Sequence, residues 1–282
     1  YHSANSRLMC HYCGYSVPFS SVCPECGKDA VRYSGFGTQK IEDELSLLLP
    51  NAKIVRMDTD STSGKNSHEK LLDSFSKGEY DIMIGTQMVA KGLNFPNVTL
   101  VGVVSVDQQL YNDDFRSLEK TFSLLTQVVG RSGRGELKGQ AIIQTLTPEN
   151  EIIRLAAKQD YDEFFKTEIR LRKGLTYPPY CDLCVVGFTG ENDIIVKTAA
   201  RETLDLLKNY VKDEFKGEKI IVLGPMPARV AKISEKYRYR IIIKCRNTAR
   251  FRQMISKILV KMGTDSRFSS VTVFADIIPD TA

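Results

Sequence analysis

Two arginines, Arg131 and Arg134, stand three residues apart in the run GRSGRG, directly after a helical stretch of apolar residues. That spacing places both guanidinium groups on nearly the same face of a helix, so both can reach one anion. The small residues beside them, Gly130 among them, let the backbone approach a ligand closely. Paired guanidinium groups of this kind bind anionic groups such as carboxylates and phosphates. An isolated Arg-x-x-Arg is equally typical of a solvated helix end, so the surrounding sequence has to decide.

The glycines around these arginines do not form a known nucleotide-binding loop. A dinucleotide-binding fingerprint needs a strand before it and a helix after it, whereas here a helix comes first. The segment STSGKNS at 61–67 contains the Gly64-Lys65 pair of a phosphate-binding loop, but Thr59 stands where that loop needs its first glycine. We accept neither pattern as a nucleotide site.

Four of the seven cysteines form two Cys-x-x-Cys pairs near the start of the chain, Cys10 with Cys13 and Cys23 with Cys26. A glycine follows each pair, and such turns can present four thiolates to one tetrahedral Zn²⁺. Because four thiolates leave no open coordination position, the expected role of this zinc is structural. Disulfides or free thiols are the alternative, which is disfavoured because the rest of the chain is typical of an intracellular protein.

Cys181 and Cys184 repeat that spacing inside YCDLCVVGF, a strand-like segment. Strand alternation sends their two sulfur atoms to opposite faces, so we expect ordinary strand residues there rather than a metal site. Cys245 is expected in the core.

The chain has 282 residues, of which 42% are hydrophobic and 26% charged, as in soluble globular proteins of about two domains. No apolar run approaches the roughly 20 residues of a membrane-spanning helix, and no basic-then-apolar leader indicates export. We therefore expect a cytoplasmic monomer with no membrane partner. The net charge of +5 is mild. Because the sequence begins at Tyr1 and not at a methionine, we interpret it as part of a longer protein.

Periodicity divides the chain into four parts. Residues 1–33 are the cysteine-rich segment, incomplete as a zinc site, and residues 34–147 are typical of an α/β domain. Its strands are expected at 53–57, 80–86, 98–107 and 140–146, and its helices at 38–50, 68–78 and 115–129. Near-continuous apolar strands that alternate with helices predict a parallel sheet covered on both faces. A helical linker at 148–178 leads to residues 179–282, whose order of strand, helix, strand, strand, helix and strand predicts a two-layer α+β domain of the split βαβ type.

A basic stretch lies near the end of the chain. From Pro227 to Arg246 there are seven basic residues and one acidic residue, so this local charge of +6 exceeds that of the whole chain. In KYRYRIIIKCR, alternation places the cations on one strand face and the tyrosines on the other. A row of cations along a strand suits a nucleic-acid backbone, and a solvated strand face is the alternative. The expected DNA-binding residues here are Arg229, Lys232, Arg238, Arg240 and Lys244.

Three segments follow one another in the α/β domain: FGTQK (36–40), IGTQMVAKGLNFPNVTLVGV (84–103) and DFRSLEKTFSLLTQVVGRSGR (114–134). Together they resemble the second RecA-like lobe of superfamily 2 helicases. Within that superfamily the chain resembles the PriA family of primosomal replication-restart helicases over nearly its whole length. The cysteine pairs upstream and the segments YPPY and LGPMPA downstream carry this closer resemblance. Its most specific part is helicase motif VI, from Gln127 to Arg134.

The resemblance implies an ATP site between two RecA-like lobes, in which motif VI of the second lobe faces the γ-phosphate bound by the first. Arg131 and Arg134 then act as catalytic arginines, and Gln127 senses the nucleotide. Motif V supplies further contacts at the carboxyl end of a parallel strand, where open α/β sheets bind ligands. The expected nucleotide-contacting residues are Gly85, Thr86, Lys91, Gly92 and Gly130.

The sequence contains neither a GxxxxGK[ST] loop nor a DExH segment. We therefore expect ATP and Mg²⁺ as cofactors of the whole protein, and no ATP hydrolysis by this chain alone. Gly37 and Thr38 open a helix whose N-terminal amides can hold a DNA phosphate, and Thr38 as a plain N-cap is the alternative. Asp114, Phe115 and Arg116 match the family pattern, but no physical role follows from their types.

The resemblance also implies a C-terminal domain similar to ribosomal protein S10 that binds DNA, forked and single-stranded. Primosome proteins and single-stranded-DNA-binding protein are the implied partners, with a nucleoid-associated location. Family members have four Cys-x-x-Cys pairs that bind two zinc ions; only the last two pairs are here, so these cysteines share one zinc ion or bind none. The family signal DVDP is ADIIPD in this chain.

Two functions follow from the sequence. The first is the C-terminal half of an ATP-dependent 3′→5′ DNA helicase for replication restart at stalled forks and primosome assembly. The second is a non-enzymatic, zinc-containing module that binds DNA and protein partners.

Overall fold

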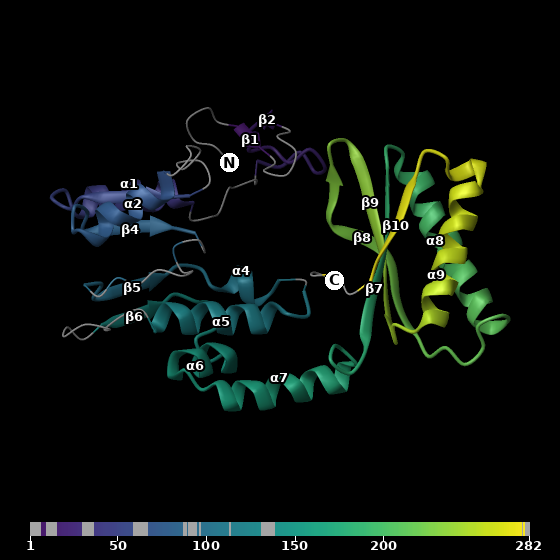
Figure 1. Ribbon diagram of the computed structural model, residues 1–282. Helices are drawn as coiled ribbons and strands as arrows, with labels where there is room; N and C mark the ends of the chain where they lie inside the picture. Colours follow the sequence, from purple (N-terminus) through teal and green to yellow (C-terminus); the bar gives the residue numbers. More distant parts are fainter. Residues whose placement is uncertain are drawn as a thin grey trace. The chain divides into compact units, whose positions relative to one another are not determined.

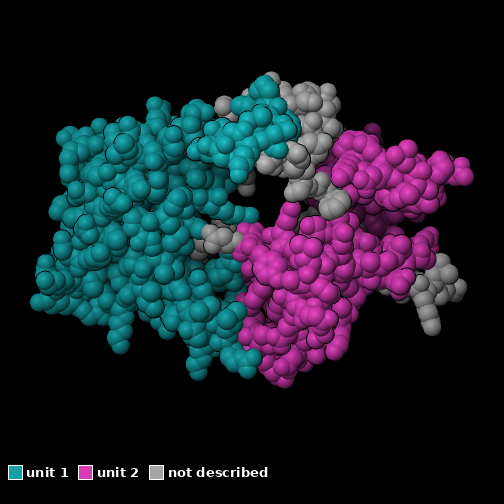
Figure 2. All heavy atoms as spheres, turned by 180° about the vertical axis from the view of Figure 1, so that it is seen from behind, with its two compact units in different colours: residues 1–33, 113–115, 169–282 teal, residues 34–112, 116–168 magenta. Residues whose placement is uncertain are grey.

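The structure is a computed structural model that describes residues 7–9, 16–29, 37–58, 67–86, 89, 95, 97–112, 114–130, 139–277 and 279. The chain separates into two units (Figure 2). Unit 1 comprises residues 1–33, 113–115 and 169–282, and unit 2 comprises residues 34–112 and 116–168.

Parallel strand pairs form the sheets of unit 2 (Figure 1). The first pair is β3 (Ile54–Met57) with β4 (Ile82–Gly85), and the second is β5 (Leu100–Val103) with β6 (Gln140–Ile143). The helices of this unit are α1 (Thr38–Leu48), α2 (Ser67–Ser76), α4 (Asp107–Leu110), α5 (Ser117–Val129) and α6 (Glu151–Lys158). The expected parallel pairing is confirmed, although the described strands form two separate pairs rather than one sheet.

The expectation of strands covered on both faces fails for the pair β5–β6. Helix α5 contacts both strands, yet every second strand position is exposed, including Leu100 at 57% and Ile142 at 54%. One face of this pair is therefore open among the residues that the structure describes.

The core of unit 2 lies along α5. Phe122, Leu125 and Val128 recur every third residue, so they share one helix face and are all buried. Phe122 stacks on Phe164 of α7 (Tyr161–Leu175), with 4.0 Å between the ring centroids. This packing fixes the helix that leads towards motif VI.

Unit 1 contains a four-stranded antiparallel sheet in the order β10-β7-β9-β8. Its strands are β7 (Asp182–Gly190), β8 (Ile221–Ile233), β9 (Lys236–Cys245) and β10 (Thr272–Ile277). Two helices, α8 (Asp193–Lys212) and α9 (Ala249–Thr264), lie on the same face of the sheet (Figure 1). The chain order β-α-β-β-α-β is the one expected from the sequence.

The main core of unit 1 lies between the sheet and these two helices. From β7, alternate residues such as Val186 and Phe188 point into it and are almost completely buried. Both helices start at a capping side chain, because Asn192 accepts a hydrogen bond from Ile195 N and Thr248 accepts one from Phe251 N.

Strands β8 and β9 form a hairpin. Its turn is the residue pair Ser234-Glu235, with φ values of 48° and 63°, which is the backbone conformation of a two-residue type I′ turn. The register shifts twice along β8, between Leu223 and Met226 and between Pro227 and Lys232. Strand β8 is thus a long strand of 13 residues whose pairing with β9 is interrupted twice.

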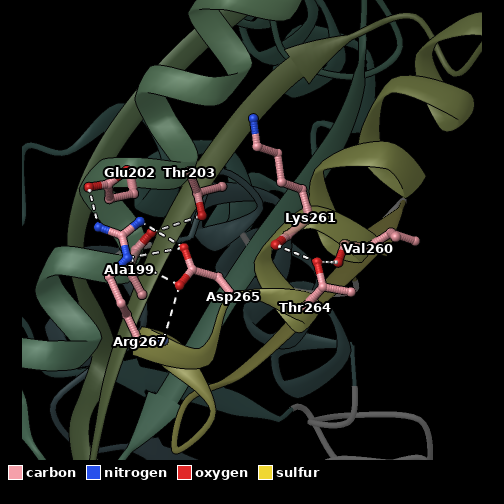
Figure 3. A network of polar contacts seen from close by, with 8 residues as sticks. All are labelled: Ala199, Glu202, Thr203, Val260, Lys261, Thr264, Asp265 and Arg267. Atoms are coloured by element: carbon pink, nitrogen blue, oxygen red, sulfur yellow. Dashed lines mark hydrogen bonds and ion pairs between the residues drawn. The ribbon is translucent and has the colours of Figure 1, made fainter.

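The turn after α9 is tied to α8 through a short 3₁₀ helix, η2 (Ser266–Phe268). In this turn Arg267 donates to Asp265, with 2.7 Å between Nη2 and Oδ2, and it also lies 3.4 Å from Glu202 Oε1 on α8 (Figure 3). All three side chains are partly exposed, so this network orients the turn but adds little stability.

Candidate functional site

Several residues that the sequence singles out lie outside the described residues. They are Cys10, Cys13, Lys91, Gly92, Arg131 and Arg134. The structure does describe elements that precede them in the chain, such as β4 and α5, together with the ends of these elements.

Helix α5 ends immediately before the two arginines. Gln127 lies on its exposed side, and its Nε2 is 3.4 Å from Ser123 Oγ. The Gly130 N–H closes the helix by donating to Thr126 O at 2.9 Å, and a Cβ at Gly130 would lie only 3.1 Å from that oxygen. The carboxyl end of a helix favours cations, because its last carbonyl groups carry partial negative charge. The chain therefore enters the arginine run from a fixed helix end.

Gly85 ends β4, where motif V begins. A Cβ at Gly85 would lie 2.1 Å from Val89 Cγ2 and 2.7 Å from Met57 O, the carbonyl of the residue paired with it on β3. Val89 thus packs directly on the end of β4, and the Thr86 carbonyl oxygen accepts the Val89 N–H at 3.1 Å. Packing requires glycine at this position.

The sequence interpretation of Thr38 as the N-cap of α1 is wrong. Gly37 occupies the N-cap position, and Thr38 is the first helical residue. The Thr38 hydroxyl donates to Asp58 Oδ2 at 2.5 Å, and Asp58 also pairs with Arg56 at 3.3 Å. The Asp58 carboxylate thus occupies the Thr38 hydroxyl. Only the backbone N–H groups in the first turn of α1 then remain to bind a DNA phosphate.

Asp107 forms a polar cluster that the sequence interpretation missed. It follows β5, and its carboxylate accepts hydrogen bonds from residues that follow β6, the Thr145 hydroxyl at 2.8 Å and the Leu146 N–H at 3.1 Å. Burial by itself raises the pKa of Asp107, but these hydrogen bonds and one from Thr147 lower it below its ordinary value. Because β5 and β6 are parallel, their carboxyl ends meet, and an acidic residue just after one of them was the available signal.

The basic hairpin residues differ in exposure. Arg229 and Lys232 are exposed, and Lys232 pairs with Glu235 at 2.6 Å. Arg238 and Arg240 are half-buried on β9, and Arg238 Nη1 donates to Val230 O at 3.4 Å. Together with the exposed Lys236 of β9, these four residues carry the basic surface of the hairpin.

Lys244 contradicts the expectation of an exposed DNA-binding cation. It is only 7% exposed, its Nζ donates to Leu175 O at 2.6 Å, and the same atom lies 3.7 Å from the Tyr177 ring centroid. Burial lowers the pKa of Lys244. Alternation assigns its strand face correctly, but other parts of unit 1 cover that end of the face.

One of the residues that pack at this end of the face is Phe115, for which the sequence supplied no role. The Phe115 ring stacks on Tyr177 with 5.1 Å between centroids and 4° between planes, and Arg172 lies 5.3 Å from the Phe115 centroid. Phe115, Tyr177 and Lys244 thus join three distant segments within unit 1. The aromatic residues in DFR and YPPY were the signal, but only the fold brings them together.

The second cysteine pair lies in a tight turn. Cys23 N donates to Lys28 O, Gly27 N donates to Cys23 O, and Gly27 has a φ of 69° that favours glycine. Backbone N–H groups of Cys26 and Glu25 hydrogen-bond to the Cys23 sulfur and lower the pKa of its thiol. This turn fits half of a thiolate zinc site. The part of the chain that the structure describes contains no cluster of three metal-ligating side chains.

The remaining cysteines behave as expected. Cys184 and Cys245 lie in the main core of unit 1, where burial raises the pKa of each thiol to about 12. Cys181 belongs to a different cluster on the opposite face of the sheet. The prediction that Cys181 and Cys184 point to opposite faces is confirmed.

Two protein-family models match the chain. The helicase conserved C-terminal domain matches residues 32–136, and the primosomal protein N C-terminal domain matches residues 173–277. None of the helices described is long and apolar enough to cross a membrane.

Curated relatives match nearly the whole chain. Replication restart protein PriA of Bacillus subtilis (strain 168) is 43% identical over 99% of this chain and 34% of its own length. The proteins of the same name from Synechocystis sp. and Borreliella burgdorferi are 39% and 35% identical, over 84% and 98% of this chain and 28% and 40% of their own lengths. The chain spans about a third of the length of these relatives.

Among solved structures, a hydantoinase/carbamoylase family amidase from Burkholderia ambifaria aligns over 34% of this chain and 27% of its own, at 12% identity and a TM-score of 0.25. No argument rests on that similarity. With both family domains in this order, and with this identity over nearly its whole length, the chain is similar to the C-terminal part of replication restart proteins PriA.

Proposed function

We propose that this chain is the C-terminal half of an ATP-dependent 3′→5′ DNA helicase that acts in replication restart at stalled forks and in primosome assembly. The observation that carries the proposal is the order of the two family domains in one chain, a helicase domain followed by the primosomal domain. The relatives named replication restart protein PriA support it.

In this proposal unit 2 is the second RecA-like lobe and supplies half of an ATP site. Packing of α5 fixes the direction from which the chain reaches Arg131 and Arg134, and Gln127 presents an exposed carboxamide one turn earlier. ATP, bound together with Mg²⁺ in the whole protein, would supply the γ-phosphoryl group, which is transferred to water with release of ADP. Arg131 and Arg134 would neutralise the charge that develops on this group, and Gln127 would sense the bound nucleotide. Gly85, Thr86, Lys91, Gly92 and Gly130 form the wall of this half-site.

The test of the arginine role is Arg134→Ala in the full-length protein. Loss of an arginine finger predicts a fall of about 10³-fold or more in DNA-stimulated ATPase activity. Arg154→Ala, which removes an exposed arginine on α6 of the same unit, is the matched control and should leave the activity nearly unchanged. ATPase activity within a few-fold of wild type in Arg134→Ala would exclude the assigned role. This chain by itself should show no ATPase activity.

DNA binding is assigned to unit 1 and to the start of α1. The exposed and half-buried cations of the hairpin, Arg229, Lys232, Arg238 and Arg240, contact the DNA backbone, and the first N–H groups of α1 at Gly37 and Thr38 hold one phosphate. The proposed partners are DNA, primosome proteins and single-stranded-DNA-binding protein. We also propose that the protein is a monomer, located in the cytoplasm and associated with the nucleoid. An S10-like fold for the C-terminal domain belongs to the same proposal.

Structural zinc is proposed for the cysteine-rich segment, held by Cys23 and Cys26 together with Cys10 and Cys13. The turn at Cys23, with its hydrogen-bonded sulfur, supports the assignment. Metal analysis of the purified chain should give about one zinc ion per chain, and Cys23→Ser should lower that content. A metal-free chain that remains folded would refute the zinc assignment.

A further inference from the structure

The sheet of unit 1 has a second face that the two helices do not cover. Here it is called the outer face. At one end, Phe115 and Tyr177 pack against Leu183 and Ile242 of this face and form a small apolar cluster. The other end carries a different set of side chains, an aromatic ring and two arginines.

The strand register fixes how these side chains are arranged. Phe274 of β10 pairs with Gly187 of β7, and Gly187 pairs with Arg240 of β9. In the next row, Thr189 of β7 pairs with Arg238 of β9. Directly paired residues point to the same face of an antiparallel sheet, so Phe274, Gly187, Arg240, Thr189 and Arg238 share the outer face.

Gly187 lets the Phe274 ring lie across the middle of the sheet. A Cβ at Gly187 would lie 2.3, 2.6 and 2.9 Å from three atoms at the far end of that ring. The ring therefore lies directly over the β7 backbone and reaches towards Arg240. Even so, Phe274 is 45% exposed, so part of this aromatic ring is open to solvent.

An exposed aromatic ring beside guanidinium groups on a sheet is suited to single-stranded nucleic acid. Bases stack on aromatic side chains, and arginines pair with the phosphates on either side of the stacked base. A duplex hides its base faces, so it can use the arginines but not the ring. The positive charge of the hairpin, +6 over residues 227–246, favours a polyanion over a neutral partner.

We propose that the outer face of the unit 1 sheet is a binding site for single-stranded nucleic acid, in which one base stacks on Phe274 and Arg238 and Arg240 bind the adjacent phosphates. This inference rests on the proposed DNA-binding function and adds to it a site and the stacking contact that would favour single strands. The stacked base gives the site its preference for single strands.

Phe274→Trp turns the site into its own reporter, because the chain contains no tryptophan. Binding of a single-stranded thymidine oligonucleotide should quench the indole emission, over the same concentrations at which anisotropy of a labelled oligonucleotide reports binding. An abasic strand of equal length should bind and leave the emission unchanged, because it has phosphates but no base to stack.

Two further variants separate stacking from folding. Phe274→Leu keeps an apolar side chain over Gly187 but cannot stack, so its affinity for the thymidine oligonucleotide should fall between about fivefold and about a hundredfold. Phe274→Tyr keeps the ring and should bind like the wild type. Affinity for a duplex should be the same for all three chains.

Two outcomes separate the outer-face site from the general DNA-binding function. In the first outcome, anisotropy shows saturable binding of the oligonucleotide, the indole emission of Phe274→Trp does not change, and Phe274→Leu keeps its affinity. This result would overturn the outer-face site and leave DNA binding elsewhere intact. Absence of any binding by anisotropy, at low salt and with both strands and duplexes, would overturn the DNA-binding function and the site together.

Discussion

Unit 2 and unit 1 place their candidate chemistry at different positions on their elements. In unit 2 it lies where elements end, with Gly85 closing β4 and Gly130 closing α5. In the four-stranded sheet of unit 1 it lies within strands, with Arg238 and Arg240 inside β9 and Phe274 inside β10. Sites at the ends of helices and strands depend on the spacing of residues within one short segment, and a sequence motif records that spacing. Sites on a strand face depend on the register between strands, which no single segment reveals.

Glycine illustrates the same difference. At Gly85 the space that a Cβ needs is taken by a backbone carbonyl and by a β-branched side chain close to its own backbone. At Gly187 it is taken by the far end of a phenylalanine side chain, which can rotate away. Rigid neighbours thus exclude a side chain at Gly85 in unit 2, whereas Gly187 makes room for the ring of Phe274.

The largest effect is expected for Gly85→Ala. Its Cβ would overlap Val89 and Met57 O, and such overpacking costs about 1–3 kcal/mol of stability. Urea unfolding of the chain, followed by circular dichroism, measures this cost. Gly102→Ala on β5 is the matched control, since no atom lies within 4 Å of its Cβ position. Equal midpoints for the two variants would show that Val89 and Met57 O do not crowd Gly85 as described.

Much of the fold was predictable because it follows from periodicity. The apolar positions of α5, the order of the six elements in unit 1 and the parallel pairing in unit 2 agree with the sequence patterns. Alternation also placed Cys181 and Cys184 on opposite faces correctly. In each case the pattern lies within one continuous segment.

The misses involve contacts between segments distant in sequence. Lys244 has the right strand face for a DNA contact, but Tyr177, far upstream, covers it. Thr38 has the right residue type for an N-cap, yet Asp58 at the end of β3 takes its hydroxyl. Asp107 and Thr145 meet only because their parallel strands end together. None of these pairings has a signal within either segment alone.

A smaller effect is expected at the aromatic cluster, which joins residues 113–115 to the rest of unit 1. A double-mutant cycle of Phe115→Leu and Tyr177→Leu should give a coupling energy of about 0.5–1.5 kcal/mol, because leucine retains apolar contact and loses ring stacking. Urea unfolding of the four chains supplies the cycle. Phe115 with Phe164 is the control pair, since the two residues belong to different units and share no ring contact among those described. A coupling as small as that of the control pair would contradict the stacking.

The smallest effect concerns two cations on the same strand face. Arg238→Ala should weaken binding to a single-stranded oligonucleotide and should make the plot of log affinity against log salt concentration shallower by about 0.7, the value for one lost phosphate contact. Lys244→Met should leave that slope unchanged, because the Lys244 ammonium group is buried and bonded to Leu175 O. Methionine keeps most of the side-chain volume, so the strand should retain its register.

These two variants test whether burial by other segments, rather than strand alternation, determines which cations can contact DNA. A shallower slope for Lys244→Met would restore the simple row of cations that the sequence suggested. An unchanged slope for Arg238→Ala would remove β9 from the nucleic-acid interface and leave the exposed Arg229 and Lys232 on β8 to carry the charge.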